Sequence, residues 1–397
     1  MNILHICNDF CGSKVHANLY AEFDRQGMQQ TVYAYYRDAS LAGKNSFEGE
    51  ATEFVYRPIL STYHRILYHK KIRDVYNDLE RQFAASLQTY DLAHATTLFS
   101  DGAVALRLYK EYGVPYFVTV RNTDINEFLG YAPHTWVTGI KVLKAAEKII
   151  FISKALKDKF CRHPLIRLHL KEIENKFVIQ PNGIDAYWLE NIKETPAEEN
   201  HNVIYVGRFD YNKNVMKLCQ SILEMRNTFP DIQLHLVGGD GRYGGWVKNI
   251  AYKNPETIIY HGKIYDKATL KDIYSRCSVF VMPSYHETFG LVYIEALSQH
   301  LAIVYTKGQG VDGMLDRRVG ESVKASSKAD IKGAIEKIFR HRSNYLAAEV
   351  VDFAQFRWDA IASRYIELYG NSCTVNLESV SMIPNCWSTK SSGKNAV

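Results

Sequence analysis

Short runs of apolar, often β-branched residues alternate with amphipathic stretches along most of this chain, and this alternation constrains its fold most strongly. The runs form two series, the first at 2–7, 31–36, 91–98, 116–121, 148–153 and 176–183, and the second at 203–208, 232–239, 257–262, 278–284 and 301–306. Helical patterns fill the gaps, for example at 16–27, 267–277 and 291–300. Continuous apolar strands separated by helices are typical of parallel sheets covered by helices on both faces.

The strands are too many for one compact sheet, and the polar stretch ETPAEEN (194–200) separates the two series. A length of 397 residues allows two or three domains of roughly 150 residues each. We therefore predict an α/β protein with two doubly wound, Rossmann-like domains that face a central cleft. The expected parts are an N-terminal domain (1–185), a C-terminal domain (186–356), a final helix (357–370) and a Ser-rich, mostly disordered tail (371–397).

Charge and composition exclude some classes of function. Lys plus Arg exceed Asp plus Glu by only 48 to 43, which does not suggest a nucleic-acid-binding protein. The opening MNILHICNDF has no basic segment and is expected to form a strand rather than a signal peptide. No apolar run approaches the roughly 18 residues of a membrane-spanning helix. We expect a cytoplasmic protein whose scattered cysteines are free thiols.

Open α/β sheets bind ligands at the carboxyl ends of their strands, and unusual residues fall there. In GRFDYNKNV (207–215), Arg208 ends a predicted strand and Lys213 stands beside the start of a helix. Two cations next to a helix N-terminus suit a diphosphate. A solvated basic turn is the alternative interpretation.

A second strand end carries PSYHETFGLVYIEAL (283–297), with seven residues between Glu287 and Glu295. Backbone N–H groups from Thr288 to Leu291 would be free donors for phosphate oxygens. Glu295 would lie in the second helical turn, where a carboxylate can accept both hydroxyls of a ribose. The alternative makes Glu287 a helix-start acid and Glu295 a surface residue. However, the apolar surroundings of Glu295 favour a functional role, because a bare carboxylate is costly to bury.

The paired glutamates, the Gly-Arg…Lys loop and Pro-Asn-Gly-Ile-Asp (181–185) together resemble glycosyltransferase family 4, whose members are retaining enzymes of the GT-B fold. The resemblance runs from the Gly12 loop to Trp358 and excludes the tail. It implies that Arg208 and Lys213 neutralise the donor diphosphate and that Glu287, as a catalytic residue, faces the donor sugar.

The resemblance also implies a donor site. Glu295 would hold the nucleotide ribose, and the other donor-binding residues would be Thr288, Phe289, Gly290, Leu291, Gly239, Asp240, Gly12 and Ser13. The final helix would cross back to the N-terminal domain. The donor would be a nucleotide-sugar, with a UDP-sugar expected, and no cofactor or metal is expected because no Asp-x-Asp motif is placed to chelate a metal.

One departure from the family concerns the strand that ends in FVTVRNTD (117–124). Many relatives have a histidine where this chain has Arg121, followed by Asn122 and Asp124. Guanidinium does not deprotonate in proteins, so Arg121 cannot accept a proton. It could bind the donor phosphate, position an acidic acceptor, or simply pair with Asp124. His134 could replace the missing imidazole.

The acceptor is expected to be a glycan or a lipid-linked molecule. Residues 57–73 (RPILSTYHRILYHKKIR) mix basic, aromatic and aliphatic residues, and a helix of this kind could rest on anionic lipid. The basic stretch 153–171 also favours peripheral membrane contact. A solvated helix with its apolar stripe on the sheet is the alternative.

Three hypotheses follow. The leading one is metal-independent, retaining hexosyl transfer in the synthesis of a cell-surface polysaccharide. A nucleotide-sugar epimerase of the same architecture is the first alternative. A catalytically silent subunit that binds a nucleotide-sugar is the second, and the missing histidine favours it.

Overall fold

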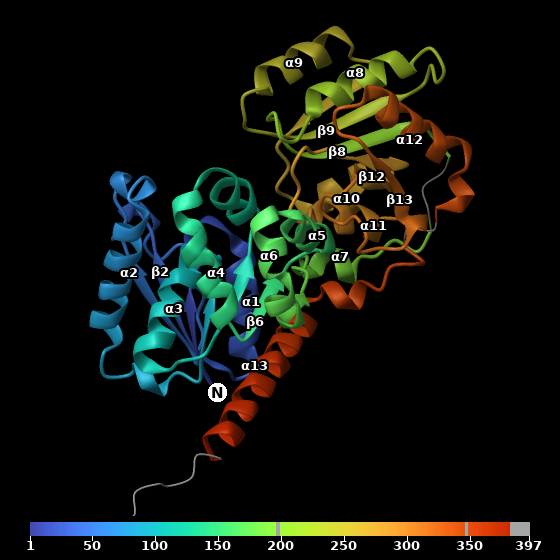
Figure 1. Ribbon diagram of the computed structural model, residues 1–397. Coiled ribbons are helices and arrows are strands. Elements are labelled where there is room, and N and C mark those ends of the chain that lie inside the picture. Colours follow the sequence, from blue (N-terminus) through green and yellow to red (C-terminus); the bar gives the residue numbers. More distant parts are fainter. Residues whose placement is uncertain (196–198, 346–347, 382–397) are drawn as a thin grey trace, which may run out of the picture.

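The computed structural model describes residues 1–195, 199–345 and 348–381. They form two α/β domains, as predicted, one from the first half of the chain and one from the second (Figure 1). Every strand pairing in both sheets is parallel. Because both faces of each sheet are covered, most strands are buried along their length, which explains their continuous apolar runs.

The N-terminal domain contains a seven-stranded sheet in the order β3-β2-β1-β4-β5-β6-β7. Its strands are β1 (Asn2–Ile6), β2 (Gln29–Tyr35), β3 (Thr52–Arg57), β4 (Leu92–Ala95), β5 (Tyr116–Val120), β6 (Lys148–Phe151) and β7 (Phe177–Ile179). The helices are α1 (Lys14–Arg25), α2 (Tyr68–Phe83), α3 (Asp101–Tyr112), α4 (Trp136–Ala145), α5 (Lys154–Arg162) and α6 (Pro164–Ile173). The strand order reverses between β1 and β4, where a doubly wound sheet binds its ligand.

The C-terminal domain contains a six-stranded sheet in the order β10-β9-β8-β11-β12-β13. Its strands are β8 (Asn202–Arg208), β9 (Gln233–Gly239), β10 (Ile258–Gly262), β11 (Val279–Val281), β12 (Ala302–Thr306) and β13 (Gly320–Val323). The helices are α7 (Ala186–Glu190), α8 (Val215–Met225), α9 (Gly244–Lys253), α10 (Lys267–Ser275), α11 (Leu291–Ser298) and α12 (Lys328–Arg340). Here the order reverses between β8 and β11.

The last helix, α13 (Trp358–Ser381), leaves the second domain and lies along the first (Figure 1). It packs on α1, with Tyr365 and Tyr369 buried against Phe23. Tyr369 also shares a 2.6 Å hydrogen bond with His94 of β4. The helix continues beyond residue 370 into the segment expected to be disordered, because a helix nucleated by such packing propagates at little cost. The remaining part of that segment, 382–397, lies outside the described residues.

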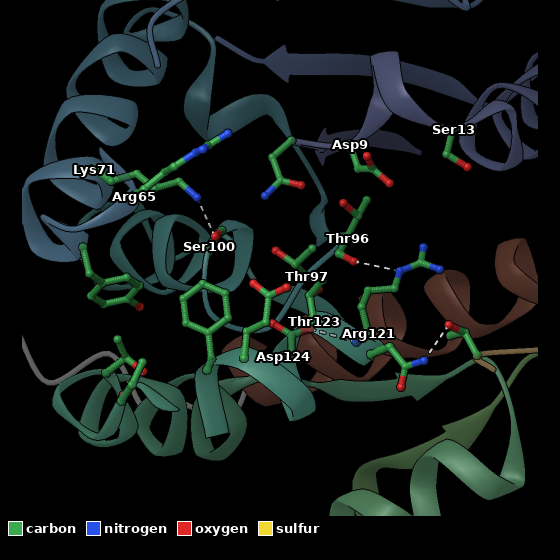
Figure 2. A pocket seen from close by; sticks show the side chains of 18 of the residues that line it. Asp9, Ser13, Arg65, Lys71, Thr96, Thr97, Ser100, Arg121, Thr123 and Asp124 are labelled. Carbon is green, nitrogen blue, oxygen red and sulfur yellow. Dashed lines mark hydrogen bonds between the residues drawn. The ribbon is translucent and has the colours of Figure 1, made fainter. Parts of the chain in front are cut away.

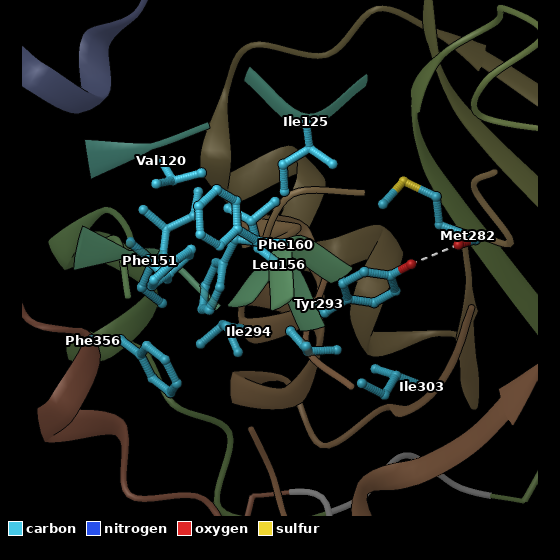
Figure 3. Close-up of a cluster of buried hydrophobic side chains, with 14 of the residues drawn as sticks. Val120, Ile125, Phe151, Leu156, Phe160, Met282, Tyr293, Ile294, Ile303 and Phe356 are labelled. Atoms are coloured by element: carbon cyan, nitrogen blue, oxygen red, sulfur yellow. Dashed lines mark hydrogen bonds between the residues drawn. The ribbon is translucent and has the colours of Figure 1, made fainter. Parts of the chain in front are cut away.

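Buried apolar side chains form a cluster that is continuous between the two domains (Figure 3). Phe151, Leu156 and Phe160 of the first domain lie on one side, and Tyr293 and Ile294 of the second lie on the other. The Tyr293 hydroxyl donates a 2.6 Å hydrogen bond to the Met282 carbonyl, which ties α11 to the end of β11. This packing fixes the loop before α11 against the first domain.

Candidate active site

The candidate residues of the second domain lie where β8 and β11 end, the point of strand-order reversal. Arg208 is the last residue of β8, and its side chain is 70% exposed, 3.8 Å from the Asp210 carboxylate. The other oxygen of Asp210 accepts the backbone N–H of Lys213 at 2.9 Å. Asn214 then takes a left-handed conformation (φ 57°) and begins α8. Asp210 therefore shapes the loop that carries both predicted cations.

Lys213 and Glu287 meet directly. The Lys213 Nζ lies 2.6 Å from Glu287 Oε2, and both side chains are largely buried. The other oxygen of Glu287 accepts the N–H of Thr288 at 3.1 Å. One of the expected free donors is thus occupied by this carboxylate. Among the described residues, the N–H groups of Phe289, Gly290 and Leu291 have no hydrogen-bond partner, as expected for the start of α11.

Glycine is required in the turn before α11. Gly290 has φ +85°, and a Cβ there would lie 2.5 Å from the Tyr293 ring. Gly310, from the loop after β12, has φ +53° and supports the turn, and a Cβ on it would come within 2.9 Å of the Glu287 side chain. Its N–H donates to the Glu287 carbonyl at 3.0 Å. Two glycines thus allow the Glu287 loop to pack tightly.

Glu295 lies in the second turn of α11, as predicted, and no hydrogen bond to its carboxylate is found within the described residues. Burial raises the pKa of Glu295 to about 7, and the nearby Asp185 raises it further, while Lys267 opposes both. Asp185 is itself engaged by Lys267 at 2.5 Å. A carboxylate without donors in a desolvated position is suited to accept hydroxyls from a ligand.

Of the four other predicted residues, Gly239 ends β9 and Asp240 follows it, while Gly12 and Ser13 lie between β1 and α1. Asp240, at the end of β9 after Gly239, has φ 49° and pairs with Lys263 at 2.6 Å. Gly12 ends a 3₁₀ turn (Phe10–Gly12) in which a Cβ would lie 2.4 Å from the Asp9 carboxylate. Ser13 caps α1 by accepting the Val15 N–H at 3.4 Å. Ser13 lines the cleft described next, whereas Gly12, Gly239 and Asp240 do not.

The acceptor-side candidates all line a single cleft of about 850 Å³ at the carboxyl edge of the N-terminal sheet (Figure 2). Arg121, Asn122, Asp124 and His134 contribute to it, and so does Thr288 of the second domain. The Asn122 side-chain amide donates to the Thr288 hydroxyl at 2.8 Å. The Ser153 hydroxyl donates to the Thr288 carbonyl at 2.9 Å. Thr288 therefore connects the Glu287 loop to the N-terminal cleft.

The expected alternative of an Arg121–Asp124 side-chain pair is wrong. Asp124 accepts the backbone N–H groups of Leu98, Phe99 and Arg121, at 3.1, 3.1 and 2.8 Å. Its burial raises its pKa to about 6, and these backbone bonds oppose that shift. The Arg121 side chain instead donates through Nε to the Thr96 carbonyl at 3.2 Å, which leaves the rest of its guanidinium facing the cleft (Figure 2).

The segment 57–73 does not form the single basic helix that we expected. Arg57 ends β3 and forms a 2.6 Å ion pair with the buried Asp78, a 3₁₀ turn follows (Thr62–Arg65), and α2 begins only at Tyr68. Pro58 explains only the extended Arg57, which pairs with Tyr35 of β2, since the residue before a proline is disfavoured in the helical conformation. The stretch 153–171 is likewise divided between α5 and α6.

Sequence reasoning missed most of the residues that line the cleft. Its further polar and charged lining includes Asp9, His16, Arg37, His64, Arg65, Lys71, Thr96, Thr97, Ser100 and Glu127. Arg37 and Thr96 closely follow strands, so the rule that identified Arg208 could have found them. Arg65 and Lys71 belong to the segment 57–73, for which the sequence favoured a membrane-facing role.

None of the helices in residues 1–195, 199–345 and 348–381 has the length and apolar character that a membrane span requires. Within the same ranges, no three His, Cys, Asp or Glu side chains are grouped so that they could hold a metal ion.

Comparison with known proteins supports the division into two domains and identifies the family. A sequence model described as "Glycosyltransferase Family 4" matches residues 12–187, and one described as "Glycosyl transferases group 1" matches residues 188–349. The chain is 24% identical over 297 residues to the glycogen synthase of Mycobacterium tuberculosis, an alignment that spans 70% of this chain and 68% of that protein.

Solved structures share the fold. Sucrose-phosphate synthase from Thermosynechococcus elongatus superposes with a TM-score of 0.68 at 18% identity, over 94% of this chain and all of that one. The Anabaena protein Alr3699/HepE in complex with UDP gives a TM-score of 0.64 at 14% identity, over 96% of this chain and all of that one. The two family models match consecutive halves of the chain, which correspond to its two doubly wound domains. This chain therefore belongs to glycosyltransferase family 4, with the GT-B fold.

Proposed function

We propose that this glycosyltransferase is a retaining, metal-independent hexosyltransferase that uses a nucleotide-sugar, with a UDP-sugar as the expected donor. The observation that carries the proposal is the Lys213–Glu287 pair at the carboxyl ends of β8 and β11, joined through Thr288 to the N-terminal cleft. The complex of Alr3699/HepE with UDP supports the choice of base.

In the proposed mechanism, Arg208 and Lys213 stabilise the negative charge that develops on the leaving diphosphate, so no metal is required. Glu295 accepts the ribose hydroxyls, and Glu287 positions the donor sugar. The acceptor hydroxyl attacks from the face that the nucleotide leaves, and a departing phosphate oxygen takes its proton. A protein base is not needed, which agrees with an arginine at position 121. Orientation in the closed cleft supplies the remaining catalysis.

We further propose that the acceptor is a glycan or a lipid-linked glycan of a cell-surface polysaccharide, and that the enzyme acts in the cytoplasm at the membrane face. Support for membrane contact comes from the turn before α2, where Tyr63, Ile66 and Leu67 are 42%, 80% and 48% exposed. Lys70 and Arg73 follow these residues in the chain. Exposed apolar residues among cations suit an anionic lipid surface.

The deciding experiment is proton NMR of the purified protein with UDP-, GDP- and ADP-sugars, in chelator and without acceptor. Slow release of nucleotide and of sugar with the α configuration from one α-linked donor supports metal-independent retention and identifies the donor. A changed sugar configuration on an intact nucleotide-sugar would indicate an epimerase. Donor binding without turnover, both in this assay and when it is repeated with candidate acceptors, would indicate a silent subunit.

The membrane contact is tested separately by sedimentation with vesicles that contain anionic lipid. Ile66→Asp together with Leu67→Asp should release the protein from the vesicles. Leu168→Asp, at an 80% exposed position on α6, is the matched control. Equal sedimentation of both variants would contradict this contact site.

A further inference from the structure

One end of the N-terminal cleft is lined by three cations from separate elements. Arg37 follows β2, Arg65 ends the 3₁₀ turn, and Lys71 lies in the first turn of α2. Figure 2 shows Arg65 and Lys71 beside Ser100 at one end of the cleft, while Asp9, Ser13 and Arg121 lie at the other. We refer to Arg37, Arg65 and Lys71 as the cation cluster.

Within the described residues, the cation cluster forms no ion pair with a carboxylate. Among the described residues, none of its three members lies within 4.0 Å of an Asp or Glu oxygen. Lys71 donates instead to the neutral Ser100 hydroxyl at 2.7 Å. By contrast, the adjacent Lys70, which does not line the cleft, pairs with Asp74 at 2.8 Å. Within the described part of the chain, the cations that face the cleft therefore lack the counter-ion that their neighbour has.

The buried acids nearest to the cluster are already engaged. Asp101 accepts hydrogen bonds from Tyr35, Thr96 and Thr97 at 2.6, 2.8 and 2.9 Å. Asp124 accepts three backbone N–H groups, as described above. Both act on Lys71 only as more distant charges, while burial and the charge of Arg37 lower the pKa of Lys71.

Burial of the Lys71 ammonium group without a carboxylate partner is costly, whereas the guanidinium groups of Arg37 and Arg65 are exposed to solvent. A bound anion removes this cost, and guanidinium and ammonium donors match the oxygens of phosphate and carboxylate groups. The donor diphosphate is not the natural occupant, because Arg208 and Lys213 lie in the other domain and do not line this cleft. Thr288 is the single cleft-lining residue from beyond position 185 in the described part of the chain.

We propose that the acceptor substrate is anionic, and that Arg37, Arg65 and Lys71, with Ser100, bind its phosphate or carboxylate group. The hydroxyl that receives the sugar then points toward Thr288 and Arg121, at the opposite end of the cleft. This inference rests on the proposed transferase function and specifies the chemical class of its acceptor. The anionic group belongs either to a soluble sugar or to a lipid carrier.

Calorimetry on the full chain tests the proposal. UDP binding is measured first, and inorganic phosphate, glucose 6-phosphate and glucose are then titrated into the UDP-saturated protein. Glucose 6-phosphate should bind at least about tenfold more tightly than glucose, since charge-assisted hydrogen bonds distinguish them. Arg37→Gln and Lys71→Gln should each remove this preference and weaken phosphate binding. Lys70→Gln is the matched control, and it should leave the preference for glucose 6-phosphate and the affinity for phosphate unchanged.

The acceptor inference is overturned if glucose and glucose 6-phosphate bind equally, if no phosphate binds, or if the two cluster variants keep the preference. UDP binding reports independently on the proposed function. A wild-type protein without UDP binding contradicts the donor assignment, while the phosphate titrations, run without UDP, still decide the acceptor class. Glucuronate in place of glucose 6-phosphate tests a carboxylate, and a short-chain polyprenyl phosphate in detergent distinguishes a lipid carrier from a soluble sugar.

Discussion

The Nζ of Lys213 lies 2.6 Å from Oε2 of Glu287, so the cation expected to hold the donor diphosphate is already paired in the free protein. In the proposed mechanism, donor binding exchanges this partner for phosphate oxygens. Lys213→Met should weaken UDP binding by about tenfold to a hundredfold, the usual loss for a charge-assisted hydrogen bond. Isothermal calorimetry measures the dissociation constant of UDP, and Lys217→Met is the control, because its exposed ammonium donates to the Ser326 carbonyl and not to Glu287.

Glu287 should behave differently from Lys213. Glu287→Gln removes the competing negative charge from Lys213, so nucleotide affinity should stay the same or rise, while turnover of the donor should fall at least about a hundredfold. Steady-state kinetics and UDP calorimetry on the same protein separate the two effects. A variant that loses affinity but keeps turnover would contradict the placement of Glu287 at the donor sugar.

Glu295 should make donor binding depend on pH. Its pKa is raised to about 7 by burial, and only the ionised form can accept both ribose hydroxyls. UDP-glucose affinity should therefore decrease as the pH falls from about 8 to about 6, by up to about tenfold per pH unit below the pKa. UDP-glucose is used because its diphosphate diester does not titrate in this range. Glu295→Gln should bind more weakly at the upper end of the range and lose the pH dependence.

The same carboxyl group affects stability. Because its pKa is higher in the folded state than in the unfolded chain, the folded state binds more protons between the two values. The contribution of Glu295 to stability is full at low pH and is lost as the pH rises through about 7. Glu295→Gln should thus raise the melting temperature at about pH 8 more than at about pH 5. An equal effect at both pH values would show that Glu295 titrates normally.

The turn before α11 should tolerate only glycine at position 290. Gly290→Ala places a Cβ within 2.5 Å of the Tyr293 ring at φ +85°, which should destabilise the protein by about 1–3 kcal/mol. Gly333→Ala is the matched control, since it lies inside α12 with no atom within 4 Å of a Cβ. That control should stabilise α12 by about 0.5–1 kcal/mol. Thermal unfolding of both variants measures the contrast.

Asn122 and Thr288 should act as a pair across the domains. Their side chains share a 2.8 Å hydrogen bond, so Asn122→Ala and Thr288→Val should each lower kcat/KM. The free-energy loss calculated from kcat/KM of the double variant should be smaller than the sum of the losses of the two single variants, with a coupling energy of about 0.5–1.5 kcal/mol. Strict additivity in this double-mutant cycle would mean that the bond does not contribute to the active arrangement.

Sequence patterns predicted the sheets well where strands are buried on both faces, because a continuous apolar run such as Val203–Val206, bounded by polar residues, is typical of a central parallel strand. They missed β3 and β13, one of the two outer strands of each sheet, where TEFVYR and GESV carry polar residues on an exposed side. The basic segment 57–73 was expected to form one helix because its mixture of basic, aromatic and aliphatic residues is typical of an amphipathic helix.

The donor-side candidates were chosen because most of them stand at or just after a strand end beside a recognisable neighbour, and their roles stay predictions. Arg37 follows a strand, as Arg208 ends one, but neither Arg37 nor Lys71 has a neighbouring motif that distinguishes it from a solvated cation. Only the tertiary fold brings α2 beside the ends of β2 and β4. The same holds for Arg121 and Asp124, which are close in sequence but whose side chains bind different partners.

The attachment of α13 to the first domain has a consequence for synthesis. His94 is hydrogen-bonded to a tyrosine 275 residues later, and Phe23 packs against the same helix. The domain that leaves the ribosome first therefore cannot complete its core until the chain has been made as far as Tyr369. The second domain, whose described strands all lie within 202–323, can fold while the first still waits for its last helix. The first domain to emerge from the ribosome is thus the last to complete its fold.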